Sequence, residues 1–207
     1  MRVGVLASGE GSNLQAILDR LHGDVVEVVR VGADKPGARA LERARAAEVE
    51  TATFPADGFA HRGERDEAMA AWLGEAGVEL VVLAGYMQLV TSAFLARFSG
   101  CVINVHPALL PAFPGLRAIE QALDYGVKVF GVTVHFVDEG VDTGAVIAQR
   151  AVELPDAEDP GTVREALRPL EHDLLCEAVA AFAGGRITRD PAHPRRVRLT
   201  AAERARR

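Results

Sequence analysis

The stretch that decides the fold opens the chain: RVGVLA at residues 2–7, then the turn SGEGSN at residues 8–13. The first part is an apolar run of strand length, and the second supplies the glycines of a tight turn. We expect Ser12 to cap the helix that follows. The apolar face of that helix is marked, at helical spacing, by Leu14, Ile17, Leu18 and Leu21. A strand that runs through a glycine turn into a helix is typical of a parallel α/β sheet.

The rest of the 207-residue chain continues this alternation of strand-like and helix-like segments. Further strands are predicted at residues 25–33, 80–84, 102–105, 127–137 and 145–154. Further helices are predicted at residues 37–47 and 63–76, and a last helix begins with the capping box of Thr162 and Glu165 and ends at Gly184 and Gly185. We therefore expect an α/β fold: a Rossmann-like, mostly parallel sheet with helices on both faces and an antiparallel C-terminal portion.

Neither an internal repeat nor a low-complexity linker divides the sequence, so residues 1–207 are expected to form a single domain. Residues 186–207 are interpreted as an Arg-rich tail with a tendency to be flexible.

Composition and charge argue against several classes of protein. The net charge of −6 disfavours a nucleic-acid partner, which requires a basic surface. Cys101 and Cys176 lie far apart in apolar segments, so we interpret them as free buried thiols and expect no metal site. The apolar run at the N-terminus is too short for a signal sequence or a membrane span. These features predict a soluble, cytoplasmic protein without a membrane partner.

The glycine turn offers free backbone N–H groups at a helix N-terminus, where a phosphate binds readily. It is not the dinucleotide fingerprint, because Leu14 occupies the position of the third glycine. Asp34, at the end of the second predicted strand, has the place of a ribose-binding acid, so a nicotinamide enzyme is disfavoured but not excluded. A turn without any ligand explains this motif equally well.

Asn104 and His106 are the sharpest local feature, in the segment NVHP at residues 104–107. Side chains two residues apart on a strand point to the same face, and Pro107 ends the strand. The C-terminal ends of strands are where α/β proteins bind ligands. An amide and an imidazole side by side at such a place favour a functional site over a structural histidine.

Asp142 lies in the acidic segment 138–144, which on local grounds is best explained as an ordinary turn. His135 comes before it in a predicted strand, where packing is its expected role. A metal site made of His106, His135 and Asp142 ranks low, because their spacing matches no ligand motif.

Taken together, six motifs resemble the phosphoribosylglycinamide formyltransferase family of purine synthesis, over residue 3 to about residue 184. The motifs are SGEGSNLQ at 8–15, LAGYM at 83–87, NVHPALLP at 104–111, FPG at 113–115, VHFVD at 134–138 and DTG at 142–144. The resemblance implies transfer of the formyl group of 10-formyltetrahydrofolate, a co-substrate, to the amine of glycinamide ribonucleotide in de novo purine biosynthesis. It implies no metal, and it leaves a homodimer open.

The resemblance also implies roles for individual residues. Asn104, His106 and Asp142 would be catalytic, stabilising the tetrahedral intermediate and assisting proton transfer. As an anionic neighbour, Asp142 is expected to raise the pKa of His106. The nucleotide substrate would be bound by Gly11, Ser12, Asn13, Arg168 and Glu171. The folate would be bound by Arg62, Met87, Gln88, Leu89, Val90, Asp138, Glu139, Gly140 and Val141.

Four other functions compete with this one. A methionyl-tRNA formyltransferase would need a further basic C-terminal domain, and only about twenty residues follow Gly185. A 10-formyltetrahydrofolate hydrolase would use the same Asn, His and Asp set on water, and would be expected to carry an added N-terminal regulatory domain. A non-catalytic nucleotide-binding module of Rossmann type would not need the pair Asn104 and His106. A nicotinamide oxidoreductase is the weakest alternative.

Overall fold

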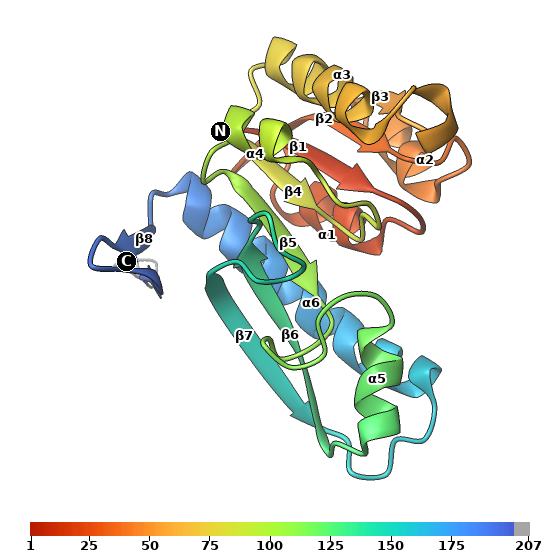
Figure 1. Cartoon of the computed structure of the whole chain (residues 1–207), viewed down its shortest axis with the longest axis vertical. Coiled ribbons are helices and arrows are strands. Elements are labelled where there is room, and N and C mark those ends of the chain that lie inside the picture. The colour runs from red at the N-terminus through yellow and green to blue at the C-terminus, as the bar shows by residue number, and fades with distance from the viewer. Residues whose placement is uncertain (201–207) are drawn as a thin grey trace.

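The computed structural model describes residues 1–200, and its centre is a seven-stranded sheet with the order β3-β2-β1-β4-β5-β6-β7 (Figure 1). The strands are β1 (Arg2–Ala7), β2 (Glu27–Ala33), β3 (Glu50–Thr53), β4 (Leu80–Leu83), β5 (Val102–His106), β6 (Val129–Phe136) and β7 (Val146–Glu153). Neighbours from β3 to β5 are parallel, whereas β6 and β7 are antiparallel. The expected α/β class, with its antiparallel C-terminal portion, is confirmed.

Helices cover both faces of the parallel part of the sheet. They are α1 (Ser12–Arg20), α2 (Arg39–Ala46), the short 3₁₀ turn η1 (Ala56–Gly58), α3 (Arg62–Glu75), α4 (Ser92–Arg97), α5 (Ala118–Tyr125) and α6 (Pro160–Ala183). Alternate side chains of each central strand enter different cores, since Leu80 and Val82 of β4 join one apolar cluster and Val81 and Leu83 join the other. The first cluster includes residues of α1, α2, α5 and α6, and the second includes residues of α3 and α4.

The same alternation decides where polar residues lie on β5 and β6. Ile103 and Val105 of β5 point into the core under α6, as do Val132 and Val134 of β6. Residues between them therefore point to the opposite face, which on this side of the sheet has no helix packed over it in Figure 1. Asn104 and His106 alternate with Ile103 and Val105 along β5, so they lie on the face that does not enter this core.

Two helix starts differ from the prediction. The cap of α1 is Gly11, in a left-handed conformation with φ 72° and no side-chain cap bond, rather than Ser12. The cap of α6 is Asp159, whose Oδ1 accepts the backbone N–H of Thr162 at 2.9 Å. Asp159 has the cap position three residues earlier, so Thr162 lies inside the first turn instead of starting the helix.

Part of the Arg-rich end of the chain forms two strands, and its expected flexibility stays a prediction. Residues 187–199 form an antiparallel hairpin of β8 (Ile187–Asp190) and β9 (His193–Leu199), which lies beyond the end of α6 (Figure 1). Ile187 and Val197 pack against the main core, and Arg189 lies over the ring of Phe136 at 3.7 Å from its centroid. The expectation for residues 201–207 lies outside the described residues. Within residues 1–200, no helix is long and apolar enough to span a membrane.

Candidate active site

Four polar side chains meet where β5 pairs with β6. They belong to Asn104 and His106 on β5, His135 on β6 and Asp142 in the loop after β6. The register places Asn104 opposite His135, and Asn104 Nδ2 is 3.2 Å from His135 Nε2. Asp142 lies between the histidines, with Oδ2 3.3 Å from His106 Nδ1 and Oδ1 3.5 Å from His135 Nε2. The structure thus brings together the three residues predicted to be catalytic, although they come from distant segments.

Asp142 is more than the turn residue that its local sequence indicates. Its backbone is left-handed, with φ 53°, and its Oδ2 accepts the N–H of Gly115 at 2.7 Å. Burial alone would raise the pKa of Asp142. The hydrogen bond from His135, the N–H of Gly115 and the charges of both imidazoles outweigh it and lower the pKa to about 2. Asp142 is therefore a carboxylate at neutral pH.

His106 is buried, and its Nε2 lies 2.8 Å from the carbonyl oxygen of Phe113. A carbonyl only accepts, so Nε2 carries the proton and Nδ1 is the nitrogen that faces Asp142. Burial lowers the pKa of His106, and the opposing effects of the Phe113 carbonyl and Asp142 do not cancel it. Asp142 raises this pKa, as expected, but desolvation is stronger and the net shift is downward.

His135 is the member of the cluster that the sequence analysis assigned to packing. It is buried, and its Nδ1 is 2.8 Å from the carbonyl oxygen of Phe136, so Nδ1 carries a proton. Its Nε2 lies 3.2 Å from Asn104 Nδ2 and 3.5 Å from Asp142 Oδ1, so it accepts from Asn104 when it is unprotonated and donates to Asp142 when it carries a proton. Only the register between two distant strands reveals this contact, and no local motif carries it.

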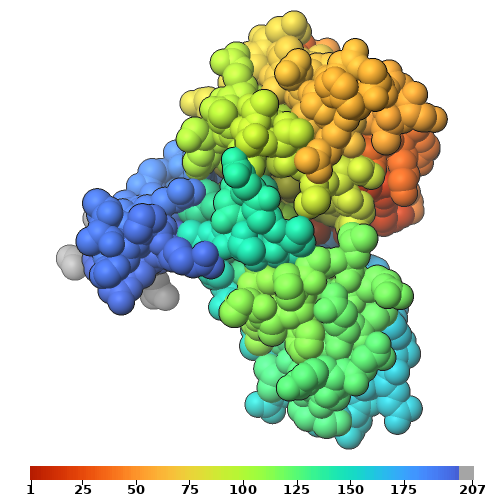
Figure 2. Space-filling model, in the orientation of Figure 1, coloured from red at the N-terminus to blue at the C-terminus, as the bar shows by residue number. Residues whose placement is uncertain are grey.

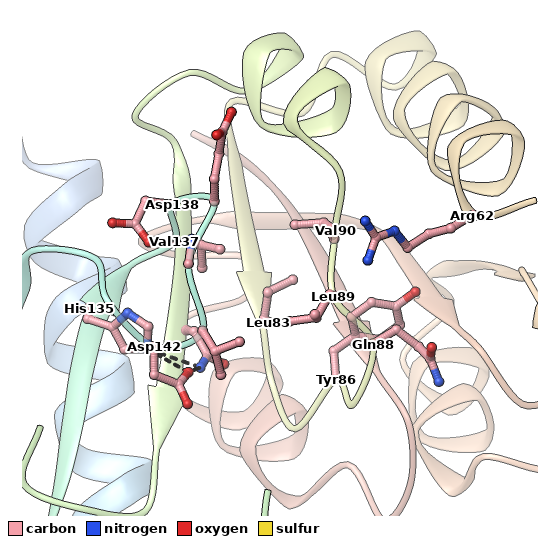
Figure 3. A pocket seen from close by; sticks show the side chains of 14 residues that line it. Arg62, Leu83, Tyr86, Gln88, Leu89, Val90, His135, Val137, Asp138 and Asp142 are labelled. Carbon is pink, nitrogen blue, oxygen red and sulfur yellow. Dashed lines mark hydrogen bonds and ion pairs between the residues drawn. The ribbon is translucent and has the colours of Figure 1, made fainter. Parts of the chain in front are cut away.

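A pocket of about 140 Å³ opens beside this cluster (Figure 3). Arg62 and Gln88 lie on one side of it, His135 and Asp142 lie on the other, and Leu83 lies between them. In Figure 2 the loop after β6, in teal, lies between the yellow-green surface around α4 and the green segment that leads into α5. The pocket is lined by Arg62, Leu83, Tyr86, Gln88, Leu89, Val90, Asn104, His135, Val137, Asp138, Glu139, Gly140, Val141 and Asp142.

The residues expected to bind folate line this pocket, with one exception. Met87 is not among the lining residues; its side chain is 56% exposed, and its backbone N–H donates to Ser8 Oγ at 2.8 Å. The apolar and aromatic part of the wall, formed by Leu83, Tyr86 and Val137, was not predicted from the sequence. His106 is also not part of the lining, since it lies behind Asp142.

The glycine turn and α6 form a second polar region. Asn13 is buried at the start of α1, and its Nδ2 donates to Glu171 Oε2 of α6 at 3.1 Å. Asn13 Oδ1 is buried without a hydrogen-bond partner. Burial raises the pKa of Glu171, against the opposing effects of Asn13 and of the positive charges of Arg168 and Arg164. Of the residues expected to bind the nucleotide, Arg168 is exposed and Ser12 is partly buried.

Comparison with known proteins decides the family. The family model described as formyl transferase matches residues 1–179. The chain belongs to the formyl transferase family. A phosphoribosylglycinamide formyltransferase of Mycobacterium tuberculosis is 45% identical over 90% of this chain and 87% of its own length. One from Bacillus subtilis is 42% identical, over 87% and 93%. The crystal structure of glycinamide ribonucleotide transformylase 1 from Symbiobacterium toebii superposes with a TM-score of 0.91, at 44% identity over 97% and 94% of the two chains.

This formyl transferase therefore has a hydrogen-bond donor, a carboxylate and two imidazoles at one end of a pocket. Such a set can bind an oxyanion and hold or move a proton, which are the requirements of acyl transfer. Over residues 1–200, no group of three or more His, Cys, Asp or Glu side chains is arranged to hold a metal ion.

Proposed function

We propose that this formyl transferase moves the formyl group of 10-formyltetrahydrofolate to the amine of glycinamide ribonucleotide, in de novo purine biosynthesis. The relatives carry this activity in their names and cover nearly the whole chain. The observation that carries the proposal is the cluster of Asn104, His106 and Asp142 at the end of the pocket. A pure binding module has no need of such a cluster.

In the proposed reaction the substrate amine attacks the formyl carbon and gives a tetrahedral intermediate. The new C–N bond forms, the bond to the folate nitrogen then breaks, and one proton moves from the amine to that nitrogen. Negative charge develops on the formyl oxygen, and stabilising it is usually the largest contribution to catalysis of acyl transfer. No covalent enzyme intermediate is required.

Asn104 is the proposed donor to this oxyanion. Its Nδ2 lies 3.2 Å from His135 Nε2 and only 3.5 Å from Asp142 Oδ1. The longer contact is the weaker one. It is therefore the one that we expect to be exchanged for the formyl oxygen.

His106 and Asp142 are proposed to act together on the proton. In this structure the Nε2–H of His106 donates to Phe113, and catalytic hydrogen bonds of a free enzyme commonly rearrange when substrate binds. The Asp142 carboxylate faces the pocket and favours the charged imidazolium when charge develops nearby. Together they can stabilise the intermediate and assist transfer of the proton to the departing folate.

The two substrates are proposed to occupy different regions. The folate takes the pocket between Arg62, the residues 88–90 and the loop 138–141, with Met87 nearby. The nucleotide is proposed to bind at Gly11, Ser12 and Asn13, with Glu171 and Arg168 from α6. The unpartnered Asn13 Oδ1 and the free N–H groups at the start of α1 suit a polar, phosphorylated ligand.

The experiment is product analysis of the purified protein with 10-formyltetrahydrofolate, with and without glycinamide ribonucleotide. We expect formylglycinamide ribonucleotide only when both are present, and equal rates with and without a chelator. Formate release at the full rate without the nucleotide would instead identify a hydrolase. Arg62→Ala is expected to raise KM for folate, and a matching rise in KM for the nucleotide would contradict the division of the site.

A further inference from the structure

A buried ion pair lies inside α3, one helical turn beyond the pocket residue Arg62. Arg65 and Asp66 have side chains that are only 2% and 0% exposed, and Arg65 Nη2 and Nε are 2.8 and 3.0 Å from Asp66 Oδ1. Burying two charges lowers stability unless their other hydrogen-bonding groups also find partners. The remaining N–H groups of Arg65 and the second oxygen of Asp66 therefore need partners elsewhere.

The further partners of these groups all belong to one short segment, Gln88–Thr91. Arg65 Nη2 donates to the carbonyl oxygen of Leu89 at 3.2 Å, and Nη1 approaches Gln88 Oε1 at 3.4 Å. Asp66 Oδ2 accepts the backbone N–H of Thr91 at 2.7 Å. Within the described part of the chain, the pair thus contacts the segment at three of its four residues.

This segment is a wall of the pocket and has no regular secondary structure of its own. Gln88, Leu89 and Val90 line the cavity, and the Leu89 side chain is 54% exposed. A further side-chain anchor is Gln88 Nε2, which donates to Asp34 at 3.2 Å. Val90 packs against the second apolar cluster, whereas Gln88, Leu89 and Thr91 are held by the hydrogen bonds described above.

We propose that Arg65 is a positioning residue for folate binding: together with Asp66 it holds Gln88–Thr91 in the shape that the pocket requires. This inference rests on the proposed function of the pocket. Neither residue lines the cavity, so neither touches a ligand there. The planar guanidinium reaches Asp66, Leu89 and Gln88 at once, which a lysine ammonium on a flexible stem cannot do.

The test compares Arg65→Lys with the double variant Arg65→Met/Asp66→Asn, which removes both charges and leaves no unpaired one in the core. The matched control is Arg30→Met. Arg30 is also a partly buried arginine, paired with Glu50 and Glu75 and lying over Trp72, but away from the pocket. All variants are measured for kcat, for both KM values, for binding of a non-reactive 10-formylfolate analogue and for thermal stability.

We expect both Arg65 variants to raise the KM for folate and the Kd of the analogue by about five- to tenfold. This is the effect of losing one or two hydrogen bonds to the segment. The KM for the nucleotide should stay within about twofold, and Arg30→Met should lower Tm without changing folate binding. The inference would be overturned if the Arg65 variants lost Tm as Arg30→Met does but kept the parent KM for folate and Kd of the analogue. The ion pair would then only stabilise the core.

Amide hydrogen exchange of the ligand-free proteins separates this inference from the proposed function. Faster exchange of the Leu89–Thr91 amides in both Arg65 variants, but not in Arg30→Met, supports the positioning role. Unchanged exchange there overturns it. A parent protein that binds no folate analogue would refute the proposed function, whatever the exchange rates are.

Discussion

Gly11→Ala tests the glycine turn most directly. Gly11 has φ 72°, a conformation that strains any residue with a side chain. A Cβ placed there would lie 2.7 Å from the Cα of Ala40 and 2.8 Å from its Cβ. Ala40 cannot easily retreat, because its backbone N–H donates to the carbonyl oxygen of Gly9 at 3.1 Å in the same turn. The substitution therefore pushes α2 away from the start of α1.

The two effects can be added for an expected loss of stability. Left-handed strain in a non-glycine residue costs about 1–2 kcal/mol. Forcing an extra methyl group into a packed contact costs about 1–3 kcal/mol. Gly11→Ala should therefore lower the free energy of unfolding by about 2–5 kcal/mol, a large share of the 5–15 kcal/mol that is typical of a domain.

The chain offers a control for each effect. Gly100 has φ 71° and nothing within 4 Å of the place that a Cβ would take, so Gly100→Ala should show only the strain of about 1–2 kcal/mol. Gly9 lies in the same turn as Gly11 with open space and no positive φ, so Gly9→Ala should be nearly neutral. Urea unfolding measures all three, and substrate kinetics should show a raised KM for the nucleotide only in Gly11→Ala. If Gly11→Ala were no less stable than Gly100→Ala, the close approach of α2 would not matter and the reasoning would be refuted.

Three further predictions concern the proposed catalytic cluster. Asn104→Ala should lower kcat by about 10²–10³-fold with little change in either KM, as steady-state kinetics can show. Asp142→Asn should lower the pKa of His106 further, so that imidazolium is lost earlier and the high-pH limb of kcat moves to lower pH; an unmoved limb would contradict this. The pKa of Asp142 falls from 3.8 to about 2 on folding, so its charge contributes about 2 kcal/mol to stability. That contribution is present above about pH 4 and is lost as the pH falls toward 2. The free energy of unfolding of Asp142→Asn, measured over the same pH range, should lack this loss.

Strands buried on both faces were the easiest part of the fold to predict. β1 and β4 are continuous apolar runs, and their predicted bounds agree with the structure to within one residue. β3 was missed because Glu50–Thr53 has no apolar run, and it is an edge strand paired with β2. The short helices α4 and α5 were missed as well, since six or eight residues hold too few turns for a periodic pattern.

For the site, the limit was tertiary pairing. The i, i+2 spacing of Asn104 and His106 predicts their shared face, but the role of His135 depends on a register that no single segment encodes. Arg65 and Asp66 would be expected at the surface from their charge, and only the helix orientation buries them. The effect of Asp142 on the pKa of His106 was predicted, but the net lowering was not, because a neighbouring charge can be inferred from sequence more readily than the extent of burial.

The bond between Asn13 and Glu171 has a consequence for how the protein is made. It joins residues 158 positions apart, and α1 packs against α6 along the same boundary. During synthesis Glu171 becomes available only after a further 158 residues have been translated beyond Asn13. The cluster around Asn104 and Asp142 is complete in sequence before that point. A product that lacks α6 would therefore keep the residues of this cluster but lose both the Asn13 contact of the proposed nucleotide site and the helix that completes the main apolar core.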